Sequence, residues 1–121
     1  MSRRILVVED QEDNRQILRD LLANAGYEML EAEDGIQAIT QASKHRPDLI
    51  LMDIQLPEVS GLQVTQWIKG DADLRMIPII AVTAFAMKGD EEKMRNGGCE
   101  AYIAKPISVT SFLQTVERFL S

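Results

Sequence analysis

The sequence predicts an α/β fold, a doubly wound parallel sheet of five strands covered by five helices, in one domain of 121 residues. Short apolar runs alternate along the chain with segments of helical periodicity, as in repeated βα units. Most of these runs are apolar throughout, which is typical of parallel strands covered on both faces. The length suits one domain with its own core.

The predicted strands are residues 5–8, 28–32, 49–52, 77–82 and 101–104. Four of them are continuous apolar runs too short for helices, and we interpret these as buried strands. Residues 28–32 are a weaker candidate that follows Gly26, a residue typical of helix ends, and we expect an edge strand there.

Helical spacing separates these runs. The apolar positions that should face the sheet are Ile17, Leu18, Leu21, Leu22 and Ala25; Ile36, Ile39 and Ala42; Leu62, Thr65 and Ile68 after the candidate N-cap Ser60; and Phe112, Leu113, Val116 and Leu120. Between residues 87 and 98 only Met94 is an interior apolar anchor, so we expect this helix to bury little surface and to be easily displaced. Met29, Met52, Met76 and Met94 are expected to fill the core.

Right-handed crossovers leave few topologies for such a chain, and a flavodoxin-like sheet with strand order 2-1-3-4-5 fits best. Ligands of such sheets bind beyond the carboxyl ends of the strands, where the winding direction reverses. The residues that end each strand are therefore the candidates for function.

Composition excludes several classes of function. Thirteen basic and nineteen acidic side chains leave a net charge of -6, so we expect no direct binding to nucleic acid. No apolar stretch approaches the roughly 20 residues that span a bilayer, so no membrane insertion is expected. The single cysteine, Cys99, cannot form an internal disulfide, which suits the cytoplasm.

Polar residues end four of the predicted strands. Glu9 and Asp10 follow the first strand, Asp53 the third, Thr83 the fourth and Lys105 the fifth. Because strands one and three are neighbours in this order, three carboxylates should converge, and their repulsion requires either protons or a cation. An acid at one strand end often only caps the next helix, but the coincidence at four ends favours a functional site.

Magnesium suits this group because Mg²⁺ prefers oxygen ligands and commonly joins one or two carboxylates to a phosphate. Asp10 and Asp53 can supply carboxylates, and the backbone carbonyl of Gln55 a further oxygen. Lys105 would balance the remaining charge and contact a phosphoryl oxygen, and the Thr83 hydroxyl another. This constellation indicates phosphoryl transfer.

Four segments together resemble the receiver domain of response regulators, a CheY-like family of two-component signalling proteins. They are VVED at residues 7–10, LMDI at 51–54 with Leu56, Pro57 and Gly61, VTA at 82–84, and YIAKP at 102–106. The resemblance covers essentially the whole chain. Residues 7–14, 52–61 and 81–90 are similar to the DivK type of single-domain regulator, which implies a role in cell-cycle or cell-division control.

The resemblance implies that Asp53 accepts a phosphoryl group from a phosphohistidine on a sensor histidine kinase or a histidine phosphotransferase. Asp10, Asp53 and the Gln55 carbonyl would bind Mg²⁺, with Glu9 acting through water and Mn²⁺ as a possible substitute. The protein would then be a phosphoacceptor rather than an enzyme.

Three further positions are implied to connect phosphorylation to signalling. Thr83 and Lys105 would contact the phosphoryl group, and Tyr102 would turn inward as Thr83 moves. The surface of the fourth helix, fifth strand and fifth helix would change and be recognised by a downstream protein target. The Lys105–Pro106 bond is predicted to be cis.

Residues 1–121 are expected to form a single receiver domain without an output domain, as a monomer or weak dimer. Gln55 and Phe85 should tune the lifetime of the phosphorylated state.

A receiver cut from a hybrid histidine kinase remains an alternative. A haloacid-dehalogenase-type phosphatase would need a second Asp where Gln55 stands, and the acidic loop at residues 9–13 argues against a nucleotide or flavin binder.

Overall fold

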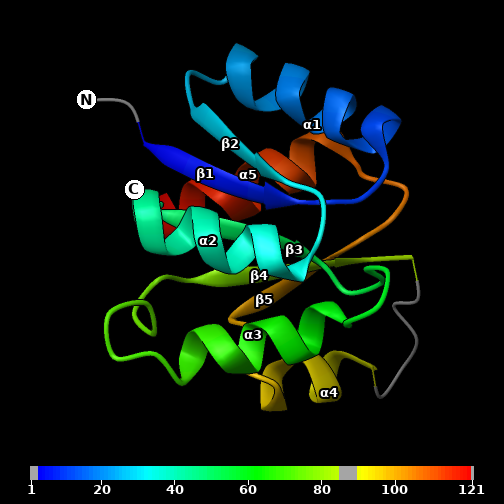
Figure 1. Ribbon diagram of the computed structural model, residues 1–121. Helices are drawn as coiled ribbons and strands as arrows, with labels where there is room; N and C mark the ends of the chain where they lie inside the picture. Colours follow the sequence, from blue (N-terminus) through cyan, green and yellow to red (C-terminus); the bar gives the residue numbers. More distant parts are fainter. Residues whose placement is uncertain (1–2, 85–89, 121) are drawn as a thin grey trace.

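The computed structural model describes residues 3–84 and 90–120, and five parallel strands form one sheet in the order β2-β1-β3-β4-β5 (Figure 1). The strands are β1 (Arg4–Val8), β2 (Glu28–Ala32), β3 (Leu49–Asp53), β4 (Ile79–Thr83) and β5 (Ala101–Ala104). The helices are α1 (Glu12–Asn24), α2 (Gly35–His45), α3 (Gly61–Lys69), α4 (Asp90–Asn96) and α5 (Val109–Leu120). The predicted fold class and strand order are confirmed.

The strands begin and end close to the predicted positions, with one clear difference. The run at 77–82 becomes a strand only from Ile79, because Pro78 has no N–H to give to the ladder and the Ile77 N–H donates backward to the Leu74 carbonyl. The third strand, β3, extends one residue beyond its predicted end to Asp53, so the sheet rather than a loop holds Asp53.

Alternate residues of each strand face two separate cores. Leu6, Ile50 and Ala81 point to the face covered by α2, α3 and α4, and Ile5, Leu49 and Ile80 to the face covered by α1 and α5. Both faces of the sheet are packed, which fits the apolar runs of the central strands β3 and β4, whereas the edge strand β2 carries Glu28 and Glu31. Cys99 and Met94 are buried in the first of these cores.

Four apolar residues that were expected in the interior are exposed instead: Ile17, Ala25, Ile36 and Met76. Ala25 lies at the C-cap of α1, just beyond the last turn of the helix. Ile17 is 54% exposed and Ile36 is 73% exposed, because each lies one position away from the stripe that its helix buries. Met76 is 84% exposed in the connection from α3 to β4, so its assignment to the core is wrong. Among the described helices, none is long and apolar enough to cross a membrane.

Candidate functional site

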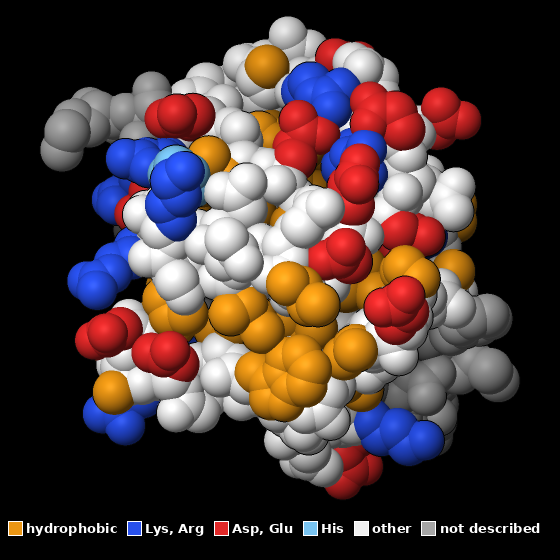
Figure 2. All heavy atoms as spheres, in the orientation of Figure 1, with side chains coloured by type: hydrophobic (Ala, Val, Ile, Leu, Met, Phe, Trp, Pro, Cys, Tyr) orange, Lys and Arg blue, Asp and Glu red, His pale blue; other side chains and the backbone are white. Residues whose placement is uncertain are grey.

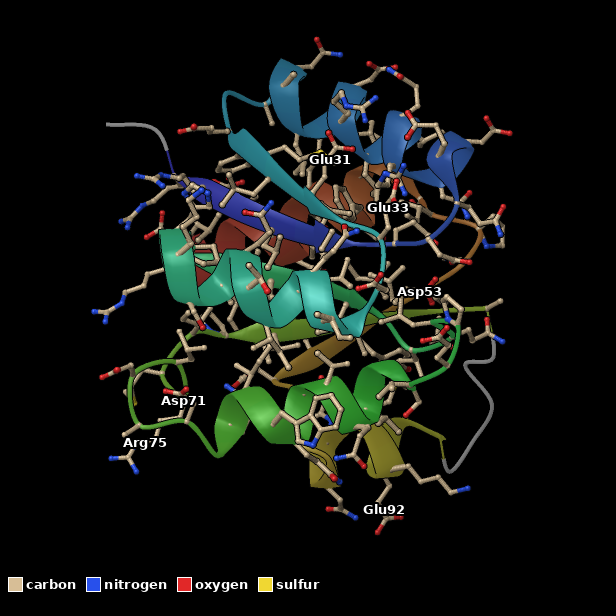
Figure 3. The ribbon with its side chains drawn as sticks, in the orientation of Figure 1. Glu31, Glu33, Asp53, Asp71, Arg75 and Glu92 are labelled. Carbon is tan, nitrogen blue, oxygen red and sulfur yellow. The ribbon has the colours of Figure 1, made fainter. Side chains whose placement is uncertain are left out.

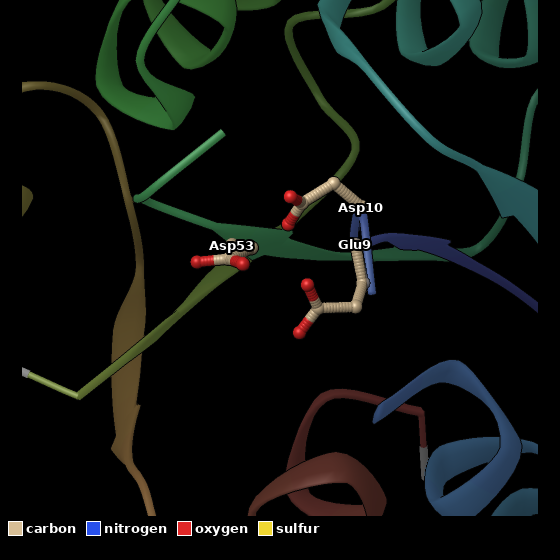
Figure 4. A group of neighbouring side chains, drawn as sticks. All are labelled: Glu9, Asp10 and Asp53. Atoms are coloured by element: carbon tan, nitrogen blue, oxygen red, sulfur yellow. The ribbon is translucent and has the colours of Figure 1, made fainter. Parts of the chain in front are cut away.

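Three carboxylates meet where β1 and β3 end. The two strands pair in register up to Val8 and Met52, so the residues that follow leave the sheet side by side. One carboxylate oxygen from each of Glu9, Asp10 and Asp53 lies within 4.8 Å of the other two, around a common space (Figure 4). Glu9 and Asp53 are buried, and Asp10 is half-buried. The predicted convergence is therefore found.

Among the described residues, Lys105 supplies the positive charge nearest to this group. Its Nζ donates to Oε1 of Glu9 at 2.9 Å and lies 3.6 Å from Oδ2 of Asp53. Partial burial lowers the pKa of Lys105, but the hydrogen bond to Glu9 and the negative charge of Asp53 outweigh it, so the net pKa is raised. Lys105 stays protonated at neutral pH, and one ammonium faces three carboxylates.

The backbone fixes the direction of the Asp53 side chain. The Gln55 N–H donates to Oδ1 of Asp53 at 2.9 Å, and the Gly61 N–H donates to the Ile54 carbonyl at 3.0 Å. At Gly61 a Cβ atom would lie 2.1 Å from the Asp53 carbonyl oxygen, so only glycine lets the start of α3 approach this closely. The Ser60 hydroxyl caps α3 by accepting from the Gln63 N–H at 3.2 Å, which confirms the predicted N-cap.

The structure places Thr83 and Gln55 at or just after strand ends beside the carboxylates, whereas Tyr102 pairs with Ala81 further back in the sheet. Thr83 is buried at the end of β4, and its carbonyl accepts from the Lys105 N–H at 2.8 Å. Tyr102 on β5 is half-buried against the core beneath α2, α3 and α4. The Gln55 side chain is exposed, and Phe85 lies outside the described residues. The Lys105–Pro106 bond is cis, as predicted.

Sequence reasoning missed Arg15, a buried arginine beside the site. Its Nη1 donates to the Glu9 carbonyl at 2.8 Å, and its side chain is only 7% exposed. The signal was available in the sequence, because Arg15 precedes Leu18 and Leu22 by three and seven residues and so lies on the apolar stripe of α1. A charged residue at such a position has to find partners inside the protein.

The donor set suits a hard divalent cation. Each of the three acidic residues offers oxygen, and their mutual repulsion exceeds what one lysine can neutralise. Carboxylate oxygens with room for water or a phosphate oxygen are the environment in which Mg²⁺ is commonly bound.

Comparison with known proteins places this geometry in a family. Residues 5–117 match the response regulator receiver domain, and the chain belongs to this family of two-component signalling proteins. It is 59% identical over 120 residues to the polar-differentiation response regulator DivK of Brucella anthropi, covering 99% of this chain and 98% of that protein. DivK of Brucella ovis is 58% identical over the same length.

Solved structures agree on the fold. The receiver domain of a sensor histidine kinase from Pseudomonas aeruginosa, with a magnesium ion coordinated in its active site cleft, has a TM-score of 0.90 and 36% identity, covering 98% of each chain. The chemotaxis response regulator CheY4 of Vibrio cholerae has a TM-score of 0.92 and 26% identity, covering 98% of this chain and 99% of that one.

Proposed function

We propose that this chain is a DivK-type response regulator whose Asp53 accepts a phosphoryl group from a phosphohistidine. An Asp53 carboxylate oxygen forms a bond to phosphorus as the bond from phosphorus to the imidazole nitrogen breaks, and the electron pair returns to that nitrogen. The observation that carries this proposal is the placement of Asp53 within 4.8 Å of two other carboxylates and 3.6 Å from Lys105.

The other side chains are assigned roles around that step. Lys105 donates to one phosphoryl oxygen and the Thr83 hydroxyl to another, which stabilises charge on the transferring group. Asp10, Asp53 and the Gln55 carbonyl would hold Mg²⁺, or Mn²⁺ in its place, and Glu9 would act through a water molecule. Bound there, the ion neutralises charge on the phosphoryl oxygens.

The signal would leave through Tyr102 and the surface formed by α4, β5 and α5. Tyr102 is half-buried, so its side chain still has exposed surface that an inward movement would bury. The α4 helix has seven residues. Among those whose side chains are described, only Met94 is buried. An element with so few buried contacts is displaced at low free-energy cost.

The partners and the cellular setting are proposed on the strength of the family and its relatives. A sensor histidine kinase or histidine phosphotransferase would supply the phosphoryl group, and a downstream protein would recognise the changed surface. The DivK relatives are named for polar differentiation, which supports a role in cell-cycle or cell-division control. We also propose that the protein acts in the cytoplasm as a monomer or weak dimer. It would accept a phosphoryl group without turning over a substrate as an enzyme does.

The single-domain organisation, residues 1–121 without an output domain, is also proposed. Its support is that the match covers 98% of the length of DivK from Brucella anthropi, so that relative consists almost entirely of the same domain. The alternative, a receiver that belongs to a hybrid histidine kinase, is represented by the Pseudomonas neighbour, whose identity of 36% is lower than the 59% of that DivK.

Phosphorylation by a small phosphodonor tests the proposal directly. Purified protein is incubated with phosphoramidate and Mg²⁺, and the aspartyl phosphate is located by mass spectrometry. Asp53→Asn should abolish labelling while circular dichroism remains unchanged, because the substitution is nearly isosteric. Asp73→Asn, at an exposed aspartate outside the site, is the matched control and should label like the parent. Undiminished labelling of Asp53→Asn would contradict the assignment.

A further inference from the structure

The buried arginine of α1 has a demanding environment. The Arg15 side chain is 7% exposed and lies on the same helix face as Leu18 and Leu22. A charged group in such a place is destabilising unless it is paired and hydrogen-bonded. Each nitrogen of its guanidinium is in fact used, which indicates that the geometry around it is specific.

The guanidinium of Arg15 pairs with three carboxylates, one on α1 and two at the end of β2. Nε donates to Oε1 of Glu31 at 3.2 Å and Nη2 to Oε1 of Glu33 at 3.2 Å, and Nη2 also pairs with Glu12. Figure 3 shows Glu31 and Glu33 at the end of β2, on the side that faces α1, and in Figure 2 acidic and basic side chains are interleaved over this region. These three carboxylates pair with Nε and Nη2 of Arg15.

The remaining nitrogen reaches the site itself. Nη1 donates to the Glu9 carbonyl at 2.8 Å, and this carbonyl belongs to the peptide that joins Glu9 to Asp10. The Glu9 N–H donates to the Ala32 carbonyl at 3.0 Å, and the Gln11 N–H donates to Oε2 of Glu9 at 3.2 Å. If the bond from Arg15 were lost, this peptide could rotate and carry the Asp10 carboxylate with it.

We propose that Arg15 is a positioning residue for the divalent cation, because it fixes the Glu9–Asp10 peptide and so the direction of the Asp10 carboxylate. This inference rests on the proposed function, since it takes the Glu9, Asp10 and Asp53 group as the cation site. Groups that orient a metal ligand without touching the metal commonly change metal affinity 10- to 100-fold when they are replaced.

Arg19 provides a matched control on the same helix. Like Arg15 it pairs with Glu12 and Glu31, but the partners described for its side chain are Glu12, Gln16 and Glu31 rather than Glu9. Substitution at either position removes one positive charge from the same cluster. Only the substitution at Arg15 removes the hydrogen bond to the Glu9 carbonyl.

The sign of the effect separates positioning from electrostatics. Removing a positive charge near a cation site strengthens cation binding if charge alone acts. Removing a positioning group weakens cation binding, because the Asp10 carboxylate then has to be ordered when the ion binds. A purely structural role would lower the thermal midpoint of the cation-free protein and leave the Mg²⁺ affinity unchanged.

Mg²⁺ titration of the unphosphorylated protein, followed by amide chemical shifts, is the test. We expect the Mg²⁺ dissociation constant to rise about 10-fold in Arg15→Gln and to change less than about 2-fold in Arg19→Gln. An affinity in Arg15→Gln that equals or exceeds that of the parent would overturn the proposal, whatever happens to the thermal midpoint.

Arg15→Lys keeps the test decisive if Arg15→Gln does not fold. Its ammonium retains the charge but cannot keep the fork that holds Glu9, Glu31 and Glu33 together. A weakening of about 3-fold or more supports positioning, and an unchanged affinity contradicts it. A parent protein that binds no Mg²⁺ would overturn both the proposed function and this inference, whereas Mg²⁺ binding that is equal in parent and variants would overturn the inference alone.

Discussion

The two ends of the sheet carry the same kinds of charged residue in opposite circumstances. At the amino end, Arg3 pairs with Asp48 and Arg4 with Glu28, each at 3.8 Å with side chains at least 40% exposed. At the carboxyl end, Glu9 is 2% exposed and shares a narrow space with two other carboxylates. Water screens the first set, so these pairs are almost independent of one another, while burial couples every charge of the second set to its neighbours.

The amino end also contains a pair with several hydrogen bonds, Lys69 with Glu100, and it shows what the site does differently. Lys69 Nζ donates to Oε1 of Glu100 at 2.5 Å and to the Ile77 carbonyl at 2.9 Å, while Oε2 of Glu100 accepts from the Ile79 N–H at 2.6 Å. One acid meets one base there, and both are satisfied. Among the described residues at the carboxyl end, three acids meet one lysine, and this imbalance favours the binding of a cation.

Removal of the cation should have the largest effect on the carboxyl end. In excess chelator, labelling by phosphoramidate is expected to fall to background, because the crowded carboxylates then repel the incoming phosphoryl group. Asp10→Asn should weaken Mg²⁺ binding at least about 10-fold, as measured by titration. Glu28→Gln at the amino end removes an exposed carboxylate and should leave both measurements unchanged. Labelling at full rate in chelator would remove the metal from the mechanism.

The thiol of Cys99, at the amino end just before β5, should be almost unreactive. Burial raises its pKa to about 11, against a hydrogen bond to Thr65 that lowers it. The thiolate is the reactive form, and the ordinary pKa of a cysteine thiol is 9.0. Alkylation by iodoacetamide near pH 8 should therefore be about 100-fold slower than in the urea-unfolded chain.

The pH dependence of alkylation sharpens this expectation. The rate in the folded protein should keep rising as the pH increases toward 11, after the rate in the unfolded chain has levelled off. Equal rates in folded and unfolded protein would show that this end of the sheet opens readily to reagent.

Most of the fold could be predicted because apolar runs and helical spacing report burial directly. Leu51 and Val82 lie in such runs and proved to be buried in strands. Ile36 was misassigned because a short apolar spacing does not show which of two adjacent stripes faces the sheet. Sequence could place Asp53 at a strand end, but the pairing of Arg15 with the Glu9 carbonyl depends on how α1 returns over the sheet, which periodicity alone does not determine.

The lifetime of the aspartyl phosphate gives a prediction of intermediate size. Phe85 lies outside the described residues, so the argument rests on its position two residues after Thr83 and on a side chain that cannot orient water. Phe85→Glu should speed hydrolysis about 10-fold or more, because a carboxylate can hold the attacking water. Decay of the purified phosphoprotein in Mg²⁺ measures this.

The control for this variant lies at the other end of the molecule. Met76→Glu adds the same charge at a residue that is 84% exposed in the connection before β4, and the decay rate should stay at the parent value. Equal decay in Phe85→Glu and the parent would show that Phe85 does not control the water.

The smallest expected effects come from replacing one basic residue at each end of the sheet. They are measured as the free energy of unfolding by urea without Mg²⁺. Lys105→Met leaves the Glu9 carboxylate buried without its 2.9 Å partner and should lower the free energy of unfolding by about 1–2 kcal/mol. Arg3→Met removes one side of an exposed pair and should change it by less than about 0.5 kcal/mol. Adding Mg²⁺ should stabilise Lys105→Met more than the parent, because the ion replaces the missing positive charge beside Glu9 and Asp53. Equal losses in the two variants would mean that burial does not couple the charges at the carboxyl end, and the contrast between the two ends would then fail.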